Sequence, residues 1–512
     1  MQGLFYTMVL NKFDNEEKII GKKLYDYQHG AIDKIFQRIK DNPSEYNLLY
    51  QLPTGGGKTV IFSEIARQYI ESNHHKVLIL THRIELSKQT SNMLTEFGVK
   101  NKVIDSSVKE VTNEGKYSCF VAMVETLNNR IKENKADLDD IGLVIVDEAH
   151  YNSFRKLFKH FERCFILGVT ATPLSSNINL PMHEIYQDLI VGEKISSLIG
   201  KGFLANADIY SYNVNLSSLK IGANGDYTVK SSEELYSQNT MQSKLIGAYE
   251  GTSKGKKTLI FNNGIHTSLH VYEIFKKAGY PVMYIDNTNT KEERKKILHW
   301  FKHTPDAILT SVGILTTGFD EPSIESIIIN RATKSLALYF QMIGRGSRVL
   351  KDKKDFLVVD LGNNVARFGM WTDEVDWQLI FKNPSFFLEN LISDEDIQKN
   401  FRYEMPEEVR KKFNNSEGFE FDVQKEYEQA VKAGLKSKTV LQKSIEQHAR
   451  ICHENSEDVF DAHILSRELN DEIEYRIKQY SFCILKSSKN YLKWLEEDYR
   501  RQLRVQISMR FR

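Results

Sequence analysis

Several features that would set this chain apart from ordinary globular proteins are scarce or missing. Only four of its 512 residues are cysteines, Cys119, Cys164, Cys452 and Cys483, and they lie far apart with no C-x-x-C pair. This spacing argues against a disulfide framework and a zinc ribbon, and it is typical of a protein in a reducing compartment. No stretch of about 18 consecutive apolar residues occurs, so no membrane-spanning helix is predicted.

A surplus of one charge is also absent. The chain has 69 lysines and arginines against 68 aspartates and glutamates, a formal net charge of +1. A surface that binds a polyanion must therefore be a local groove, with acidic side chains placed elsewhere. Residues 1–20 contain no basic segment followed by a long apolar stretch, which argues against a secretory signal. We expect a cytoplasmic protein, monomeric and not bound to a membrane.

What is present is an alternation of short apolar runs and longer helical patterns. The hydrophobic share of 41% and the charged share of 27% are those of a folded globular protein, and the length suggests about three domains. Apolar runs bounded by turn residues predict buried strands at 48–52, 76–81, 120–124, 143–146, 165–170, 258–262, 282–285, 307–310, 326–329 and 356–360. Helical patterns lie between them at 59–72, 84–97, 266–278 and 291–301. This alternation predicts parallel sheets with helices on both faces.

The strand–helix pattern occurs twice along the chain. The predicted fold class is therefore α/β, with two doubly wound parallel-sheet lobes in tandem and a third region of different character. We place the first lobe at residues 1–200 and the second at 201–370. Residues 371–512 are charged, rich in tyrosine and mostly helical in pattern. We expect an α-helical accessory domain there, which would also be the place for a protein effector to bind.

A glycine-rich loop follows the first predicted strand and opens a helix. Glycines let backbone N–H groups turn inward around phosphates, because a Cβ would block the approach. Lys58 would bring a positive charge to the β- and γ-phosphates of ATP, and Thr59 would offer a hydroxyl ligand to Mg²⁺. The strict pattern has glycine where Leu52 stands, and the alternative is an ordinary glycine-rich turn before a helix. The residues predicted to bind the nucleotide are Pro53, Thr54, Gly55, Gly56, Gly57, Lys58 and Thr59.

A carboxylate pair ends a later strand of the same lobe. The apolar run 143–146 leads directly into Asp147 and Glu148. A carboxylate at the tip of such a strand can hold Mg²⁺, the role predicted for Asp147, and the next can deprotonate the attacking water, the role predicted for Glu148. The alternative is a polar strand end without a catalytic role. Because the pair follows the glycine-rich loop within one lobe, we predict an ATP-hydrolysing site in which Lys58 is also catalytic.

Together these motifs resemble the DEAH-box group of superfamily 2 helicases, and the resemblance covers residues 20–365. It implies two RecA-like lobes that hydrolyse ATP with Mg²⁺ and move along a nucleic acid. Residues 24–28 resemble the motif whose glutamine reads the adenine, a role that falls on Gln28. Two further segments resemble the motifs that hold a strand and couple hydrolysis to lobe movement. The residues implied in those contacts are Arg83, His150, Thr170 and Thr172.

One motif of the second lobe resembles the family's motif that contacts both the bound nucleic-acid strand and the nucleotide. It spans residues 316–320, with the sequence Thr-Thr-Gly-Phe-Asp. The resemblance implies nucleic-acid contacts for Thr317 and Gly318. It also implies a nucleotide contact for Asp320.

A second motif of this lobe, Q-x-x-G-R-x-x-R at residues 341–348, implies catalytic roles for Gln341, Arg345 and Arg348. Charge that develops on the γ-phosphoryl group needs guanidinium groups, which must come from the opposite lobe if hydrolysis depends on closure. The i, i+3 spacing predicts that the two arginines share one face at the start of a helix. Arg348 is the stronger candidate for the arginine finger and Arg345 its partner. The alternative is a solvated basic helix.

The segment 356–369, which follows this motif, resembles the corresponding segment of RadD-like repair helicases and restriction-type motors. RadD-like proteins carry cysteine clusters after the motor, which this chain lacks, so the resemblance does not extend into the C-terminal region. Gln341 and His150 both differ from the DEAD-box RNA helicases, which have histidine and aspartate at these places. This difference favours DNA over RNA as the track.

Three functions are consistent with these patterns. The first is an ATP-dependent DNA helicase or duplex translocase that acts in repair or in remodelling of branched DNA. The second is an RNA or RNA–DNA helicase, and the third is an ATP-operated switch that recruits a nuclease or another effector. The basic, aromatic stretch 486–512 fits a DNA-contacting helix and equally well a solvated helix.

Overall fold

The computed structural model describes residues 24–42, 44–73, 75–112, 115–177, 179–223, 225–316, 318–400, 405–414, 421–484 and 489–511. The chain divides into two compact units. The first contains residues 1–204, 316–320 and 372–390, and the second contains residues 205–315, 321–371 and 391–512. Residues 372–390, which we assigned to the accessory domain from sequence, therefore group with the first unit.

Within the described residues, the first unit is built on a parallel sheet of seven strands in the order β3-β4-β2-β5-β6-β1-β7. The strands are β1 (Tyr46–Gln51), β2 (Lys76–Thr81), β3 (Asn101–Ile104), β4 (Cys119–Met123), β5 (Ile141–Asp147), β6 (Phe165–Thr170) and β7 (Asp188–Val191). β2 and β6 have the bounds predicted for them and are buried along their whole length, as expected for parallel strands covered on both faces. β3 and β7 escaped prediction because each has only four residues and is partly exposed.

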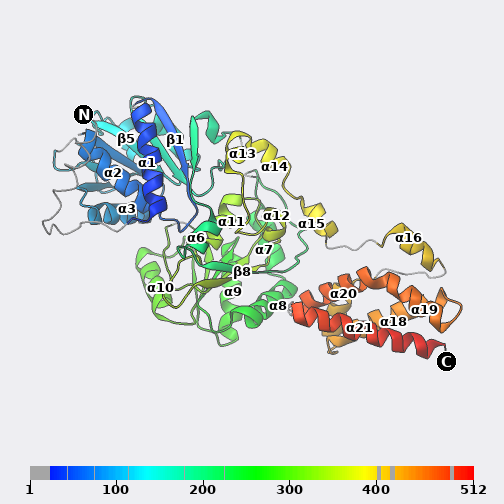
Figure 1. Ribbon diagram of the computed structural model, residues 1–512. Helices are drawn as coiled ribbons and strands as arrows, with labels where there is room; N and C mark the ends of the chain where they lie inside the picture. The colour runs from blue at the N-terminus through cyan, green and yellow to red at the C-terminus, as the bar shows by residue number, and fades with distance from the viewer. Residues whose placement is uncertain are drawn as a thin grey trace. The chain divides into compact units, whose positions relative to one another are not determined.

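The helices of this part of the chain are α1 (Asp26–Asp41), α2 (Lys58–Asn73), α3 (Ile84–Glu96), α4 (Val124–Lys132), α5 (Arg155–Phe158) and α6 (Ile195–Gly200) (Figure 1). Residues of α1, α2 and α3 share one apolar core with the strands of the sheet. Ile32, Ile35 and Ile39 recur on α1 at helical spacing and enter one apolar core with Ile61 and Ile65 of α2. The core fixes the position of the first turn of α2, which directly follows the glycine-rich loop.

The second unit contains another parallel sheet, of six strands in the described part of the chain, in the order β10-β11-β9-β12-β13-β8. The strands are β8 (Asn206–Ser211), β9 (Thr258–Asn262), β10 (Val282–Ile285), β11 (Ile308–Val312), β12 (Ser326–Asn330) and β13 (Asp355–Asp360). The helices around it are α7 (Val229–Tyr236), α8 (Asn239–Ala248), α9 (Ile265–Lys277), α10 (Lys291–His303), α11 (Leu336–Ile343) and α12 (Asn364–Phe368). The predicted class of two parallel-sheet α/β lobes is confirmed.

The C-terminal region is helical, as predicted. α13 (Trp377–Lys382) and α14 (Pro384–Glu389) belong to the first unit. The other helices are α15 (Asp394–Asn400), α16 (Glu407–Arg410), α17 (Val423–Lys432), α18 (Lys438–Glu454), α19 (Val459–Leu465), α20 (Asn470–Cys483) and α21 (Lys489–Arg510). Apolar residues of α17 to α21 form a core of their own, which we call the C-terminal bundle.

A buried polar cluster lies inside the C-terminal bundle. The Tyr499 hydroxyl lies 2.9 Å from His448 Nδ1 and 2.7 Å from Ser444 Oγ. Arg476 donates hydrogen bonds to Ser444 Oγ and to the Glu472 carboxylate. His448 is fully buried, and burial lowers its pKa to about 4. Tyr499, an aromatic residue of the basic C-terminal stretch, is therefore a core residue and not a surface for stacking on bases.

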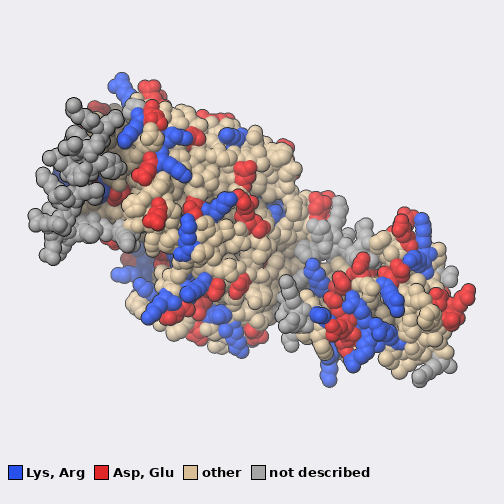
Figure 2. All heavy atoms as spheres, in the orientation of Figure 1, with Lys and Arg blue, Asp and Glu red and all other residues tan. Residues whose placement is uncertain are grey.

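On the face drawn in Figure 2, basic and acidic side chains lie interspersed and form no large field of one sign. None of the described helices is both long enough and apolar enough to cross a membrane.

Candidate functional site

The glycine-rich loop lies between the end of β1 and the start of α2. Gly55 and Gly57 have positive φ angles of 89° and 85°, which favour glycine over residues with a Cβ. A Cβ on Gly57 would lie 2.6 Å from Gln28 Nε2. Leu52, which departs from the strict loop pattern, is fully buried beneath the loop, and its N–H donates to the Thr170 carbonyl (3.0 Å). The backbone of residue 52 thus ties the start of the loop to β6, and its apolar side chain is buried beneath Gly56.

Gln28, predicted to read the adenine, lies beside this loop. It is buried, and its Oε1 accepts a hydrogen bond from the Tyr25 N–H (2.9 Å) at the start of α1. The Tyr27 hydroxyl donates to the Gly56 carbonyl (2.8 Å). The first contact closes the N-terminal turn of α1, and the second ties that turn to the loop. A base bound beside the phosphates could therefore meet the Gln28 amide.

The loop residues fit a bound triphosphate. The Thr54 hydroxyl is buried and has no hydrogen-bond partner among the described residues, although buried polar groups are usually paired. Lys58 Nζ donates to the Leu52 carbonyl (3.2 Å), which keeps the ammonium over the loop. Thr59 follows it in the first turn of α2. Donors around a glycine cradle at a helix N-terminus are the usual environment of phosphates.

Lys58→Ala is expected to abolish ATP hydrolysis, because the β- and γ-phosphates lose the cation of the loop. The measurement is steady-state ATP turnover, with thermal unfolding to show that the variant is folded. Lys34→Ala removes an exposed lysine from α1 of the same unit and should hydrolyse ATP as the wild type does. Turnover in Lys58→Ala at the wild-type rate would contradict the assignment of the loop.

Asp147 and Glu148 lie together where β5 ends. Both are buried, with 5% and 8% of their surface exposed. Burial and the neighbouring Glu148 raise the pKa of Asp147, while Lys58 opposes the shift. Two carboxylates in this position favour a cation between them and the phosphates, and oxygen ligands suit Mg²⁺. Asp147 and the Thr59 hydroxyl are the groups that would hold it.

Glu148 has a left-handed backbone, with φ of 53°, which is uncommon for a residue with a side chain. Its N–H donates to Asp147 Oδ1 (3.0 Å), and its Oε2 lies 3.4 Å from His150 Nδ1. Backbone strain of this kind persists only where the surrounding structure imposes it, and it is found mainly at active sites. A strained backbone at Glu148, next to the buried Asp147, is thus consistent with a functional site at this strand end.

His150 connects the carboxylate pair with β6. Its Nδ1 lies 3.0 Å from the Thr170 hydroxyl, which in turn donates to the Thr172 carbonyl (3.1 Å). Burial lowers the pKa of His150, so the ring is neutral at physiological pH. His150 from one predicted motif and Thr170 and Thr172 from another therefore lie in one hydrogen-bonded group beside Glu148.

Two aromatic residues that the sequence analysis did not single out extend this group. The Tyr151 ring lies 4.3 Å, between centroids, from the His150 ring and 4.3 Å from the His82 ring. His82 precedes Arg83, which lies just before α3 and is predicted to contact the nucleic acid. Both His82 ring nitrogens are buried without hydrogen-bond partners among the described residues, and burial lowers the His82 pKa to about 4. The signal in the sequence was that His82 lies inside the motif of residues 81–83 and that Tyr151 directly follows His150.

The segment 316–320, predicted to contact a nucleic acid and the nucleotide, groups with the first unit. The Gly318 carbonyl accepts a hydrogen bond from Gln89 Nε2 of α3 (3.0 Å), and both residues belong to the first unit. Asp320 is exposed. Thr317 lies outside the described residues. The nucleic-acid role of Gly318 and the nucleotide role of Asp320 stay predictions.

The predicted helix start at Arg345 and Arg348 is wrong. α11 ends at Ile343, and both arginines lie in the turns that follow it. The Arg345 N–H still donates to the Met342 carbonyl (3.2 Å), but the helix does not continue. A Cβ on Gly346 would lie 2.2 Å from the Phe356 ring. Glycine is therefore needed there for close packing on β13, and we call residues 344–348 the finger turn.

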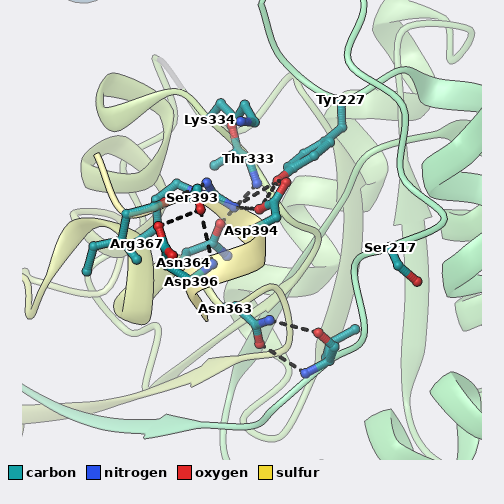
Figure 3. A network of polar contacts seen from close by, with 12 residues as sticks. Ser217, Tyr227, Thr333, Lys334, Asn363, Asn364, Arg367, Ser393, Asp394 and Asp396 are labelled. Carbon is teal, nitrogen blue, oxygen red and sulfur yellow. Dashed lines mark hydrogen bonds and ion pairs between the residues drawn. The ribbon is translucent and has the colours of Figure 1, made fainter. Parts of the chain in front are cut away.

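Side chains from elsewhere in the second unit hold the loop that leads into α11 (Figure 3). Asp226 accepts hydrogen bonds from the Thr333 hydroxyl (2.7 Å) and from the Lys334 N–H (2.8 Å). Asn364 accepts one from the Thr333 N–H (3.0 Å) and donates to the Arg331 carbonyl (2.9 Å). These contacts fix the start of α11, whose buried Gln341 is the predicted catalytic glutamine.

The same framework reaches the C-terminal region. Arg367 donates to the Tyr227 hydroxyl (2.8 Å) and to Asp394, the first residue of α15. Tyr227 donates to the same carboxylate, at 2.6 Å and 2.7 Å from its two oxygens (Figure 3). The segment 356–369 thus connects the loop before α11 with the first residues after the second lobe.

No three His, Cys, Asp or Glu side chains gather as a metal site in the part of the chain that the structure describes. The predicted Mg²⁺ ligands are two, Asp147 and the Thr59 hydroxyl, and Mg²⁺ usually retains waters and phosphate oxygens as its other ligands.

Two protein families match the chain. Residues 21–175 match the res subunit of type III restriction enzymes, and residues 239–349 match the helicase conserved C-terminal domain. The first match contains Lys58, Asp147 and Glu148. The second contains Gln341 and the finger turn up to Arg348.

Individual proteins agree with these matches. The chain is 29% identical to the ATP-dependent helicase IRC3 of Saccharomyces cerevisiae over 66% of its own length and 51% of the yeast protein, so it spans about half of that relative. It is 21% identical to the ATP-dependent DNA helicase uvsW of enterobacteria phage T4, over 61% of this chain and 64% of the phage protein. An HsdR subunit fragment of a type I restriction enzyme from Vibrio vulnificus has a similar fold, with a TM-score of 0.53 at 21% identity over 68% of this chain and 67% of the fragment. The chain belongs to superfamily 2 of the helicases.

Proposed function

We propose that the protein is a DNA-dependent ATPase that acts as a helicase or duplex translocase, in repair or in remodelling of branched DNA. Its first unit binds ATP and Mg²⁺, and its second unit supplies the arginines of the finger turn. Hydrolysis then depends on closure of the two units. A nucleic-acid strand that binds the closed state more tightly than the open state promotes that closure.

The observation that carries this proposal is the buried pair Asp147 and Glu148 at the end of β5, within the electrostatic influence of Lys58. ATP supplies the γ-phosphoryl group. Lys58 and Thr59 orient the phosphates, and Asp147 holds the cation. Glu148, whose carboxylate lies beside His150, orients a water and accepts its proton.

DNA is the proposed track for two reasons. Gln341 and His150 differ from the residues of the DEAD-box RNA helicases, and the phage T4 relative is named as a DNA helicase. The hydrogen-bonded group of His150, Thr170 and Thr172 is the proposed link between the strand and hydrolysis, since Arg83 and His82 lie next to it through Tyr151.

The test is ATP turnover of the full chain in the presence of double-stranded DNA, single-stranded DNA or RNA, beside a strand-displacement assay. We expect the strongest stimulation from DNA, and Lys58→Ala serves as the control for contaminating ATPases. If RNA stimulates ATP turnover and DNA does not, the protein is an RNA helicase and the proposed DNA motor is wrong. Stimulation by DNA without strand displacement or translocation would favour a switch that recruits an effector.

A further inference from the structure

Lys353 lies in the turn between the finger turn and β13, and neither the sequence motifs nor the proposed mechanism gives it a role. It is 8% exposed. Its Nζ donates to three backbone carbonyls, those of Gly346 (2.6 Å), Arg348 (2.9 Å) and Pro322 (3.0 Å). Two of these carbonyls belong to the finger turn. The third lies on the segment before β12, so one ammonium group joins the finger turn to the sheet.

Packing around Lys353 reinforces this arrangement. Its Nζ lies 5.7 Å from the centroid of the Phe356 ring, and the same ring fills the space beside Gly346. The bridge between Leu350 and Lys353, with hydrogen bonds of 3.0 Å and 3.1 Å, closes the turn that carries the lysine. The backbone bridge fixes where the Lys353 side chain begins, and the three carbonyls and the Phe356 ring fix where its ammonium group ends.

We propose that Lys353 is a positioning residue for hydrolysis, whose ammonium group holds the backbone of the finger turn so that the Arg348 guanidinium can reach the γ-phosphoryl group. The proposal rests on the proposed function, because it assigns Arg348 to that group. An ammonium has three N–H donors, one for each of the three carbonyls, whereas a neutral amine has two. Loss of the proton leaves one of the carbonyls without its partner.

The charges around Lys353 determine when that proton is lost. Burial, assisted by the positive charge of Arg348 and opposed by Glu325 and Glu321, lowers the pKa of Lys353 to about 8. Asp352 and Lys354, its neighbours on the same turn, are exposed. Because the pKa is lowered, the ammonium is present below about pH 8 and is lost as the pH rises through that value. Turnover of the wild-type protein should fall over the same interval.

The experiment compares three variants of the full chain. Lys353→Met keeps the length of the side chain and removes its donors, and kcat for ATP is expected to fall about 100-fold, the size of effect that a displacement of about 1 Å has in an active site. KM for ATP should stay unchanged, since the nucleotide is held by the first unit. Lys353→Arg should restore most of kcat. Lys354→Met removes the adjacent exposed lysine and should behave as the wild type.

The pH profile distinguishes positioning from a general loss of stability. In the wild type and in Lys354→Met, kcat should fall with an apparent pKa near 8. In Lys353→Arg this alkaline limb should disappear, because the guanidinium stays protonated. A wild-type kcat in Lys353→Met, or a limb near pH 8 that persists in Lys353→Arg, overturns the proposal. The second comparison needs only Lys353→Arg, and it remains decisive if Lys353→Met does not fold.

Arg348→Ala separates the failure of this proposal from failure of the function on which it rests. Normal turnover in Lys353→Met beside slow turnover in Arg348→Ala refutes the role of Lys353 alone. Normal turnover in both, with no turnover in Lys58→Ala, refutes the finger assignment and the proposal together.

Discussion

ATP turnover of the Arg348→Ala variant is expected to fall by a factor of about 10³, the effect of removing an arginine finger in related phosphoryl transfers. Binding of ATP should stay nearly intact, because Lys58, Thr54 and the glycine-rich loop lie in the first unit. Stimulation by DNA should disappear as well, since closure no longer brings the charge to the γ-phosphoryl group. The measurements are turnover with and without DNA and a nucleotide-binding titration.

The matched control is Lys351→Ala, which removes an exposed positive charge three residues beyond Arg348. This variant should turn over ATP as the wild type does. DNA-stimulated turnover at the normal rate in Arg348→Ala would show that the finger lies elsewhere. Arg345, in the same turn, would then be the first residue to test.

The Glu148→Gln variant is expected to bind ATP and hydrolyse it about 10² to 10⁴ times more slowly, the usual contribution of a general base. Glutamine has the shape of glutamate and keeps the same backbone requirements at φ of 53°, but its amide cannot accept the proton of the attacking water. Mg²⁺ should still bind, because Asp147 is unchanged. Turnover and the Mg²⁺ dependence of ATP binding are the measurements.

Asp147→Asn provides the contrast. It should raise the Mg²⁺ concentration needed for ATP binding, an effect that Glu148→Gln should not have. If Glu148→Gln turns over ATP at the wild-type rate, the general base has been misassigned. Similar Mg²⁺ dependence in the two variants would mean that the two carboxylates do not divide the roles as proposed.

The sequence predicts best those features that depend on a short stretch of chain. The loop around Lys58 and the pair Asp147 and Glu148 are recognised from a few adjacent residues, because binding phosphate and Mg²⁺ requires them next to one another. β2 and β6 were predicted with their observed bounds because apolar runs buried on both faces leave a continuous signal. The edge strand β8 was missed, since its residues are mostly exposed and resemble a linker.

Features that depend on distant segments were not predicted. Lys353 is one of several lysines in a charged turn, and only the fold places its Nζ beside the Pro322 carbonyl. The end of α11 depends on how closely Gly346 approaches Phe356, which the i, i+3 spacing of the arginines does not reveal. The stack of His82, Tyr151 and His150 joins residues from two separate loops.

The polar cluster inside the C-terminal bundle makes that bundle sensitive to acid. His448 is held neutral, with its pKa lowered to about 4, whereas in an unfolded chain it would titrate near 6.5. The unfolded state therefore binds more protons between these values, and the stability of the bundle is complete above about pH 6.5 and declines as the pH falls towards 4. On mild acidification we expect the near-ultraviolet signal of its tyrosines to change, while a His448→Gln variant loses this dependence. A protein stored or assayed in acid would therefore lose the packing around His448 within the C-terminal bundle, so the pH of the buffer decides whether this part of the chain keeps its native core.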